Sequence, residues 1–425
     1  CGTAILQGAP LGFANQLKTG PVGLISASGT GLQQVACLLA QRGIGVSHAI
    51  GVGGRDLHHQ LGAPSMRAAL QALAHDQHTQ VIVLISKPPD TAVAHCLAKE
   101  AKATGKPCVL ALIGWAEPFA SVDGLYCVST LEAAALTATQ LANGASLCSA
   151  QTLPTTHWRR QIAAARANLQ AGQHSLVGLY CGGTLATEAL WLLRHFGLSV
   201  RSNLDNTYQV GDSKQNVILD LGAEMFTRGR PHPMIDPQVR DQQLLALVEQ
   251  PSVAVVLCDV MLGWGSHAAP GVTLAAAWQE FRQHLSRHQR QAIGIATLCG
   301  TADDPQDMAY QCQVLQEQGF LIAESNAQAA RLAAAILGIP WQAMHTTAVV
   351  ATDNVASSTP PLDNATPDIP SHLPALLADG PKVINLGLEQ FATQLETSGV
   401  PVLHVDWRPP AAGDRRLAEM LERLR

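Results

Sequence analysis

Aromatic residues are scarce in this sequence: tryptophan, tyrosine and phenylalanine together make up 4% of its 425 residues. Charged residues are also few, at 14%, and no run of lysine or arginine could follow a phosphate backbone. Because the formal net charge is −5, nucleic acid is not expected as a partner. No apolar run has membrane-spanning length, and no signal peptide is visible. We therefore expect a cytoplasmic protein that binds neither nucleic acid nor membranes.

Paired cysteines are also lacking. Cysteine occurs ten times, but never as a Cys-x-x-Cys pair, and several cysteines sit inside apolar strand-like runs. This usage is typical of a reducing compartment and not of a disulfide framework, so we expect all ten to be unpaired. His58 and His59 are adjacent and have no partner at metal-ligand spacing, so no metal site is expected.

What the sequence does contain is a repeated strand–turn–helix pattern. "VGLISASGTGLQQVA" (Val22–Ala36) and "VGLYCGGTLATEALWLL" (Val177–Leu193) each run from an apolar strand through a small-residue turn into an apolar helix. Continuous apolar strands separated by helices indicate a parallel sheet covered on both faces. We predict two doubly wound, mainly parallel α/β domains of flavodoxin-like type, over residues 21–150 and 175–345.

The strands of the two units can be read from the apolar runs. In the first unit these are VGLIS, SHAIGVGG, VIVLIS, CVLALIG and LYCVS, with helices expected over Gly31–Gln41, Pro64–Ala74 and Thr91–Ala103. In the second unit they are VGLY, NVILDLG, VAVVLCDV, AIGIATLCG and FLIAES. Five strands are therefore predicted for each sheet.

The remaining segments connect or extend these units. Residues 1–20 start at Cys1 without methionine, and we expect them to continue a longer chain. A linker helix is expected over 151–174 and a linker rich in proline and serine over 346–380. Residues 381–425 read as a small strand–helix–strand unit followed by a charged helix, which should dock on one of the sheets.

Candidate site residues follow the strands, because open parallel sheets bind ligands beyond the carboxyl ends of their strands. In the first unit they are Ser26, Ser28, Gly29, Thr30, Gly53, Gly54, Arg55 and Lys87. In the second unit they are Gly182, Gly183, Thr184 and, in the proline-rich "MFTRGRPHPMIDPQVR", Arg228, Arg230 and His232. We expect both glycine-rich loops to face one shared cleft; no catalytic residue is assigned.

Two interpretations of these residues stay open. The Ser-x-Ser-Gly-Thr loop offers hydroxyls and backbone N–H groups at a helix N-terminus, which suits a phosphate or carboxylate. The same residues also suit plain helix capping. Likewise, Arg228 and Arg230 could grip an anion or pair with local acids. Asp259, at the end of another strand, is expected to act in capping.

The first unit resembles a known family in the stretch "GPVGLISASGTGLQQVACLLAQRGIGVSHAIGVGGRDL". It is similar to the ligase domain of the succinyl-CoA synthetase α subunit, and the second unit to the corresponding domain of the β subunit. The resemblance implies that Ser26, Ser28, Gly29 and Thr30 take up a phosphate. It also implies a phosphohistidine, but this sequence has no histidine in the matching stretch "ALIGWAEPFASVDGLYCVS". Lys87 stands where that family has a glutamate.

Motifs spread over the whole chain resemble the FdrA family of acyl-CoA-synthetase-like proteins. They are GGRDL, SKPP, TGKP, GLYCGGTLATEA, GRPHPMIDP and HVDWRPPAAGD. That family usually carries a nucleotide-binding-like domain ahead of the Cys-Gly-Thr segment; these 425 residues do not contain it, so the resemblance does not imply a CoA site here.

The FdrA resemblance implies a subunit of an oxamate carbamoyltransferase in allantoin and purine breakdown. Such a subunit would work in an oligomer with two partner subunits. The reaction exchanges oxalurate and phosphate for oxamate and carbamoyl phosphate, so phosphate or carbamoyl phosphate is the expected ligand. Two alternatives are an acyl-CoA synthetase of the succinate–CoA ligase type, and a non-catalytic scaffold whose helix starts dock partner subunits.

Overall fold

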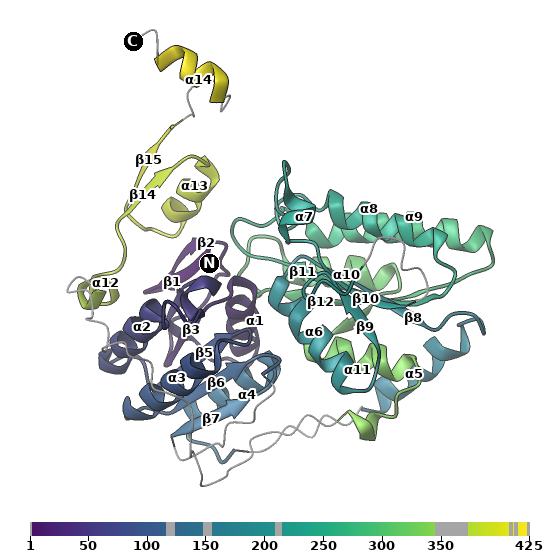
Figure 1. The fold of residues 1–425 in the computed structure, drawn as a ribbon, viewed down its shortest axis with the longest axis horizontal. Helices are drawn as coiled ribbons and strands as arrows, with labels where there is room; N and C mark the ends of the chain where they lie inside the picture. Colours follow the sequence, from purple (N-terminus) through teal and green to yellow (C-terminus); the bar gives the residue numbers. More distant parts are fainter. Residues whose placement is uncertain are drawn as a thin grey trace.

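The computed structural model describes residues 2–115, 124–147, 155–208, 215–344, 373–407, 411 and 415–422. Two large sheets, each covered by helices on both faces, lie side by side, and a small C-terminal unit lies against the first (Figure 1). The predicted mixed α/β fold with mainly parallel sheets is confirmed. The expected linker 346–380 falls largely on residues 345–372, which lie outside the described residues.

The first sheet has seven strands in the order β2-β1-β4-β3-β5-β6-β7. The strands are β1 (Thr3–Leu6), β2 (Ala9–Gly12), β3 (Val22–Ser26), β4 (Val46–Gly51), β5 (Val81–Ser86), β6 (Cys108–Leu112) and β7 (Leu125–Val128). The five predicted strands form its parallel part. Residues 1–20, expected only as a segment of a longer chain, supply two more strands: β1 and β2 form a hairpin that pairs antiparallel with β4.

Helices cover both faces of this sheet. They are α1 (Gly29–Gln41), α2 (Pro64–His75), α3 (Thr91–Ala103) and α4 (Leu131–Ala142), with a short 3-10 turn at Gly54–Leu57. Polar side chains start two of these helices: Asp90 caps α3 and Thr130 caps α4 through their side-chain oxygens. The predicted bounds of α3 are reproduced, and those of α1 and α2 differ by two residues or fewer.

The second sheet has six parallel strands in the order β13-β12-β11-β8-β10-β9. The strands are β8 (Ser175–Tyr180), β9 (Val200–Ser202), β10 (Asn216–Asp220), β11 (Val253–Met261), β12 (Ile293–Cys299) and β13 (Leu321–Ala323). Five of them were predicted. The three-residue edge strand β9 was not, because so short a run carries no apolar pattern.

The helices of this unit and of the connection before it are of very different lengths. They are α5 (Thr156–Ala167), α6 (Gly183–His195), α7 (Glu224–Thr227), α8 (Gln238–Ala246), α9 (Pro270–Arg287), α10 (Met308–Glu317) and α11 (Asn326–Ile336), with 3-10 turns at Leu247–Glu249 and Trp341–Ala343. The linker helix expected over 151–174 is α5, which packs against α11.

One hydrophobic core joins the two units. It includes Leu32 and Leu39 of α1, Leu131 of α4, and Leu185 and Leu193 of α6, all completely buried. Helix α1 contacts α6, and α4 contacts α11 (Figure 1). Because apolar side chains of both units are removed from water together, the sheets and the loops at their ends are held in a fixed relation.

The C-terminal unit forms a small sheet of its own. Strands β14 (Val383–Leu386) and β15 (Val402–Val405) pair in parallel around α13 (Glu389–Thr397), between α12 (Leu373–Asp379) and α14 (Arg415–Glu422). Helix α13 packs on edge strand β2, where Gln394 Nε2 donates a 3.0 Å hydrogen bond to the carbonyl of Pro10. The prediction that this unit docks on one of the sheets is confirmed.

Candidate functional site

The loop after β3 and the loop after β8 meet between the two units. Strand β3 lies between β4 and β5, and β8 lies between β10 and β11, so in each sheet the later strands are added on both sides of the strand that carries the loop. Each loop therefore sits at a topological switch point. The hydroxyls of Ser28 and Thr184 contact each other, and the Thr184 N–H donates to Thr30 Oγ1 at 3.4 Å. The prediction that the two glycine-rich loops face one shared cleft is confirmed.

Serine side chains shape the first loop. Ser26, buried under it, accepts the Ser28 N–H at 3.0 Å and donates to the Ser28 carbonyl at 2.6 Å. Ser28 then caps α1, because its Oγ accepts the Gly31 N–H at 3.1 Å. The N–H groups of Gly29 and Thr30 have no hydrogen bond within the described residues. Capping and anion binding are therefore compatible here: the cap uses the Gly31 N–H and leaves the N–H groups of Gly29 and Thr30 to a ligand.

A buried carboxylate shapes the second loop. Asp259, at the end of β11, accepts the N–H groups of Cys181 and Gly182, both at 2.7 Å. Burial raises its pKa to about 6, although these two hydrogen bonds pull in the other direction. A Cβ on Gly182 would lie 3.0 Å from Asp259 Oδ2. Asp259 thus has the capping role expected from the sequence, and the Gly183 N–H is left without a hydrogen-bond partner in the described structure.

A cavity of about 930 Å³ opens between these loops. Its lining comes from both units and includes the predicted Ser28, Gly29, Thr30, Gly54, Lys87, Gly183, Thr184 and His232. Lys87 supplies the one Lys or Arg side chain among the described lining residues. The helix N-termini of α1 and α6 therefore converge on a cavity whose described lining holds one cation, which favours a small anion.

Lys87 is half-buried and has neither a hydrogen bond nor an ion pair for its ammonium group within the described residues. Burial lowers its pKa, and the negative charge of Asp220 partly offsets this. Burial likewise raises the pKa of Asp220, with Lys87 acting in the opposite direction. Lys87 Nζ and Asp220 Oδ2 lie 3.3 Å and 2.6 Å from the position that a Cβ on Gly183 would occupy. A side chain there would separate or displace the two charged groups.

His232 is held in one orientation. Its Nδ1 accepts the Met234 N–H at 3.2 Å, so Nε2 carries the proton of the neutral ring. Burial lowers its pKa, which favours this neutral form. Nε2 packs on Gly222, where a Cβ would come within 2.4 Å of it. Nδ1 is therefore occupied by a local hydrogen bond, and Nε2 lies beside Gly222.

The other predicted residues lie outside the cavity lining. Ser26 and Gly182 support the loops from beneath, and Gly53 adopts a left-handed conformation, φ 86°, before the 3-10 turn. Arg55, Arg228 and Arg230 are exposed and do not line the cavity. Arg228 is 83% exposed and pairs with Glu224 at 3.1 Å, one helical turn away, as the structural alternative for this loop predicts.

Sequence reasoning did not place Asp220, Gln33, Phe13 or Met234 at the site. Gln33, Phe13 and Met234 line the cavity, and Asp220 lies behind Gly183. Asp220 had a usable signal, because it is a carboxylate at the carboxyl end of strand "NVILD". Phe13 follows the unpredicted hairpin and had none.

No group of three or more metal-ligating side chains occurs among the described residues. Within the same ranges, no helix is both long and apolar enough to cross a membrane.

The second unit matches a known protein family. Residues 179–336 match the CoA-ligase family, which covers β8 to α11 and the second glycine-rich loop. A curated protein named "Uncharacterized protein YahF", from Escherichia coli strain K12, is 36% identical over 340 residues. The match covers 78% of this chain and 65% of that protein, so the chain spans less than two thirds of its relative's length. Residues 179–336 are therefore similar to CoA-ligase domains.

Two solved structures are similar only weakly. ATP citrate lyase from Methanothrix soehngenii, in complex with citrate and coenzyme A, has 9% identity and a TM-score of 0.24, covering 85% of this chain and 55% of that chain. The C-terminus of Escherichia coli RcsC, with its linker region and phosphoreceiver domain, has 10% identity and a TM-score of 0.19, covering 78% and 91%. Scores this low do not show a common overall arrangement.

Proposed function

We propose that this chain is the anion-binding subunit of an FdrA-type oxamate carbamoyltransferase, acting in a cytoplasmic complex with two partner subunits. The observation that carries this proposal is the convergence of two helix N-termini on Lys87, a half-buried cation that makes no ion pair within 4.0 Å in the described structure. Phosphate and carbamoyl phosphate are small, doubly charged anions that suit such a site.

The cavity offers each part of the reaction a binding group. The N–H groups of Gly29, Thr30 and Gly183 bind phosphate oxygens, and the Lys87 ammonium balances their charge. A phosphate oxygen attacks the carbamoyl carbon of oxalurate, and the bond from that carbon to the amide nitrogen breaks. The proton of hydrogen phosphate ends on the departing nitrogen, which gives oxamate and carbamoyl phosphate. Charge develops on oxygen during this step, and oriented N–H groups stabilise it without reorganisation.

The alternative of an acyl-CoA synthetase is favoured by the CoA-ligase match of residues 179–336. That chemistry needs an imidazole able to accept a phosphoryl group. His232 lines the cavity, but its Nδ1 accepts the Met234 N–H and its Nε2 packs on Gly222. The hydrogen bond to Nδ1 argues against His232 as that imidazole. His58 and His59 also line the cavity, but none of the three lies in the stretch where the synthetase family carries its phosphohistidine.

The charge of the described cavity lining does not favour coenzyme A. The cofactor carries several phosphate groups, whereas Lys87 is the single Lys or Arg side chain in the described lining. Arg55, Arg228 and Arg230, which could have added charge, do not line it. No step of the proposed reaction therefore passes through this cofactor.

The test is an assay of the chain purified together with its partner subunits. We expect carbamoyl phosphate to be released from oxalurate only when phosphate is added, and no acid-labile phosphate to be incorporated from nucleoside triphosphate. Formation of an acyl-CoA thioester together with a phosphorylated chain would instead establish the synthetase. If the complex shows neither activity and binds no phosphate, the scaffold alternative is favoured.

A further inference from the structure

Lys87 lies where an amine could meet the carbonyl carbon of a bound carbamoyl phosphate. Its Nζ is 3.3 Å from the Cβ position of Gly183, whose N–H is one of the proposed phosphate-binding groups. No ion pair within 4.0 Å joins Lys87 to Asp220 or to another described carboxylate. The amine is thus next to the ligand site and is not held by a partner of its own.

The surroundings of Lys87 favour its neutral form more than water does. Pro88 and Pro89 follow it in the cavity lining, and burial lowers the pKa of the amine. Asp220 acts against this shift from behind Gly183. The other titratable groups of the described lining are Asp90, Cys181, His58, His59 and His232. A neutral lysine amine is a nucleophile, whereas the ammonium ion is not.

We propose that Lys87 is a carbamoylation site, modified by the carbamoyl phosphate that the two helix N-termini hold beside it. This rests on the proposed function, because carbamoyl phosphate must bind there. A bond forms between Nζ and the carbamoyl carbon, and the bond from that carbon to the phosphate oxygen breaks. One amine proton passes to the phosphate, so the products are a neutral urea on Lys87 and hydrogen phosphate.

The modification removes the positive charge that Lys87 supplies to the described cavity lining. A urea cannot balance the charge of a phosphate, so the carbamoylated chain binds anions more weakly than the unmodified one. Accumulated carbamoyl phosphate thereby turns off the site that binds it. Lys87→Gln, which is neutral and polar, imitates this state.

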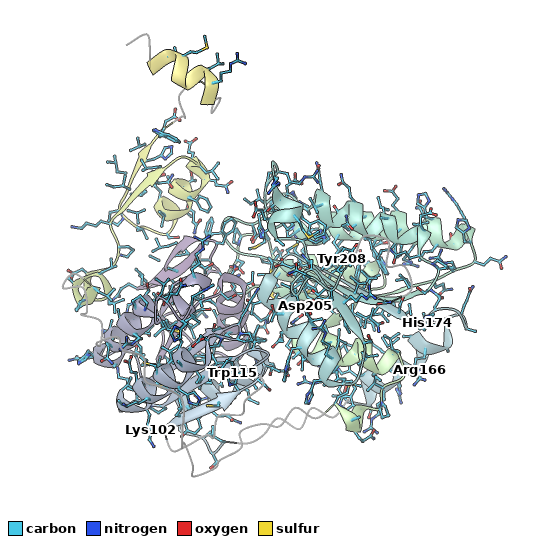
Figure 2. The ribbon with its side chains drawn as sticks, viewed as in Figure 1. Lys102, Trp115, Arg166, His174, Asp205 and Tyr208 are labelled. Carbon is cyan, nitrogen blue, oxygen red and sulfur yellow. The ribbon has the colours of Figure 1, made fainter. Side chains whose placement is uncertain are left out.

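The experiment is peptide mass spectrometry on the purified chain incubated with carbamoyl phosphate at about pH 8, where a lysine with a lowered pKa has a larger neutral fraction than an exposed lysine. Lys102 is the internal comparison, because it is exposed on α3, on the side of the first unit away from the second sheet (Figure 2). We expect Lys87 to be carbamoylated on the order of tenfold faster than Lys102, since binding places the reactants together. The rate should saturate with carbamoyl phosphate and fall when inorganic phosphate is added.

Cyanate, formed when carbamoyl phosphate decomposes, is the necessary control. Cyanate modifies amines without first binding at the phosphate site. The rate at which it modifies Lys87 should therefore not saturate with cyanate concentration, and added inorganic phosphate should not lower that rate. Equal rates at Lys87 and Lys102, or the same preference with cyanate, would overturn the proposal.

Calorimetry on the same preparation separates this inference from the proposed function. Binding of phosphate and carbamoyl phosphate without selective labelling of Lys87 overturns the carbamoylation site and leaves the carbamoyltransferase proposal standing. Failure of both anions to bind overturns both. Lys87→Arg should bind phosphate within about threefold of the unmodified chain and give no label at this position, whereas Lys87→Gln should bind at least tenfold more weakly.

Discussion

Glu188 Oε1, on α6 of the second unit, accepts a 2.7 Å hydrogen bond from the backbone N–H of Leu131, which begins α4 of the first. Its other oxygen accepts from Asn326 Nδ2 at 2.7 Å, at the start of α11. The carboxyl group is fully buried, and burial raises its pKa to about 7. One titratable side chain therefore joins three helices across the junction that positions the cavity.

This arrangement predicts a pH-dependent stability. Between its ordinary pKa of 4.5 and about 7, Glu188 keeps its proton in the folded chain and loses it in the unfolded one. The native state binds more protons, so the free energy of unfolding falls as the pH rises through this window, by about 3 kcal/mol in all. Glu188→Gln should flatten the dependence, as measured by urea unfolding at several pH values. Exposed Glu280→Gln is the control; if both variants keep the wild-type slope, the burial argument for Glu188 is wrong.

Removing the Lys87 charge should weaken anion binding. We expect Lys87→Ala to lose roughly 1.5–3 kcal/mol of phosphate affinity, the range for a hydrogen bond to a charged group. Titration calorimetry with phosphate, oxamate and carbamoyl phosphate measures this, and unfolding should show little change because Lys87 makes no ion pair in the described structure. The matched control is Lys99→Ala on α3. Equal affinities in wild type and Lys87→Ala would mean that the loop is only a capped helix.

A methyl group at Gly183 should disturb the site, whereas the same change at Gly54 should not. Both glycines line the cavity, but a Cβ on Gly183 would meet Asp220 Oδ2 at 2.6 Å and Lys87 Nζ at 3.3 Å. A Cβ on Gly54 meets its nearest atom at 3.8 Å, an ordinary contact. We expect Gly183→Ala to bind phosphate at least about tenfold more weakly, because Asp220 and Lys87 must move. Comparable affinities of the two variants would show that neither position is constrained.

The sheets could be predicted from the sequence because buried parallel strands are continuous apolar runs. The hairpin β1–β2 was missed because its second strand, "APLG", contains proline and glycine, which argue against a strand. The structure tolerates Pro10 because β2 is an edge strand. The turn between the two strands is made by Gln7 and Gly8, both with positive φ, which is the hairpin signal that the sequence did offer.

The site was predictable only in part, for a similar reason. Ser28, Lys87 and Gly183 follow strands at or beside the switch points, so topology alone gathers them. Arg55 also follows a strand, but the next residue, Asp56, is buried and accepts the N–H groups of Ser65 and Met66 at the start of α2. With Asp56 fixed inward, Arg55 is exposed. Whether a side chain after a strand points inward or outward depends on neighbours that are distant in the sequence. The same is true of the hydrogen bond between Glu188 and Leu131.

The exposed arginines give a prediction that separates surface charge from the site. Arg228 pairs with Glu224 at the surface and Arg230 is exposed, and neither lines the cavity. We expect Arg228→Ala and Arg230→Ala to change unfolding by less than about 0.5 kcal/mol and phosphate affinity by less than about twofold. A large loss of phosphate affinity in either variant would mean that the proline-rich loop reaches the ligand.

The contact between Ser28 and Thr184 should couple the two units. Ser28 Oγ caps α1 and meets the Thr184 hydroxyl of the second loop, so one atom serves both the helix and the junction. We expect Ser28→Ala to lower the free energy of unfolding by about 1 kcal/mol or somewhat more, the usual cost of a lost cap. Thr155→Ala removes the comparable cap of α5, which is exposed, and is the matched control.

In a double-mutant cycle of Ser28→Ala with Thr184→Val, the two changes should be non-additive by at least about 0.5 kcal/mol, because both remove the same contact. Urea unfolding of the four proteins measures this coupling, and strict additivity would mean that the hydroxyl contact does not hold the two loops together.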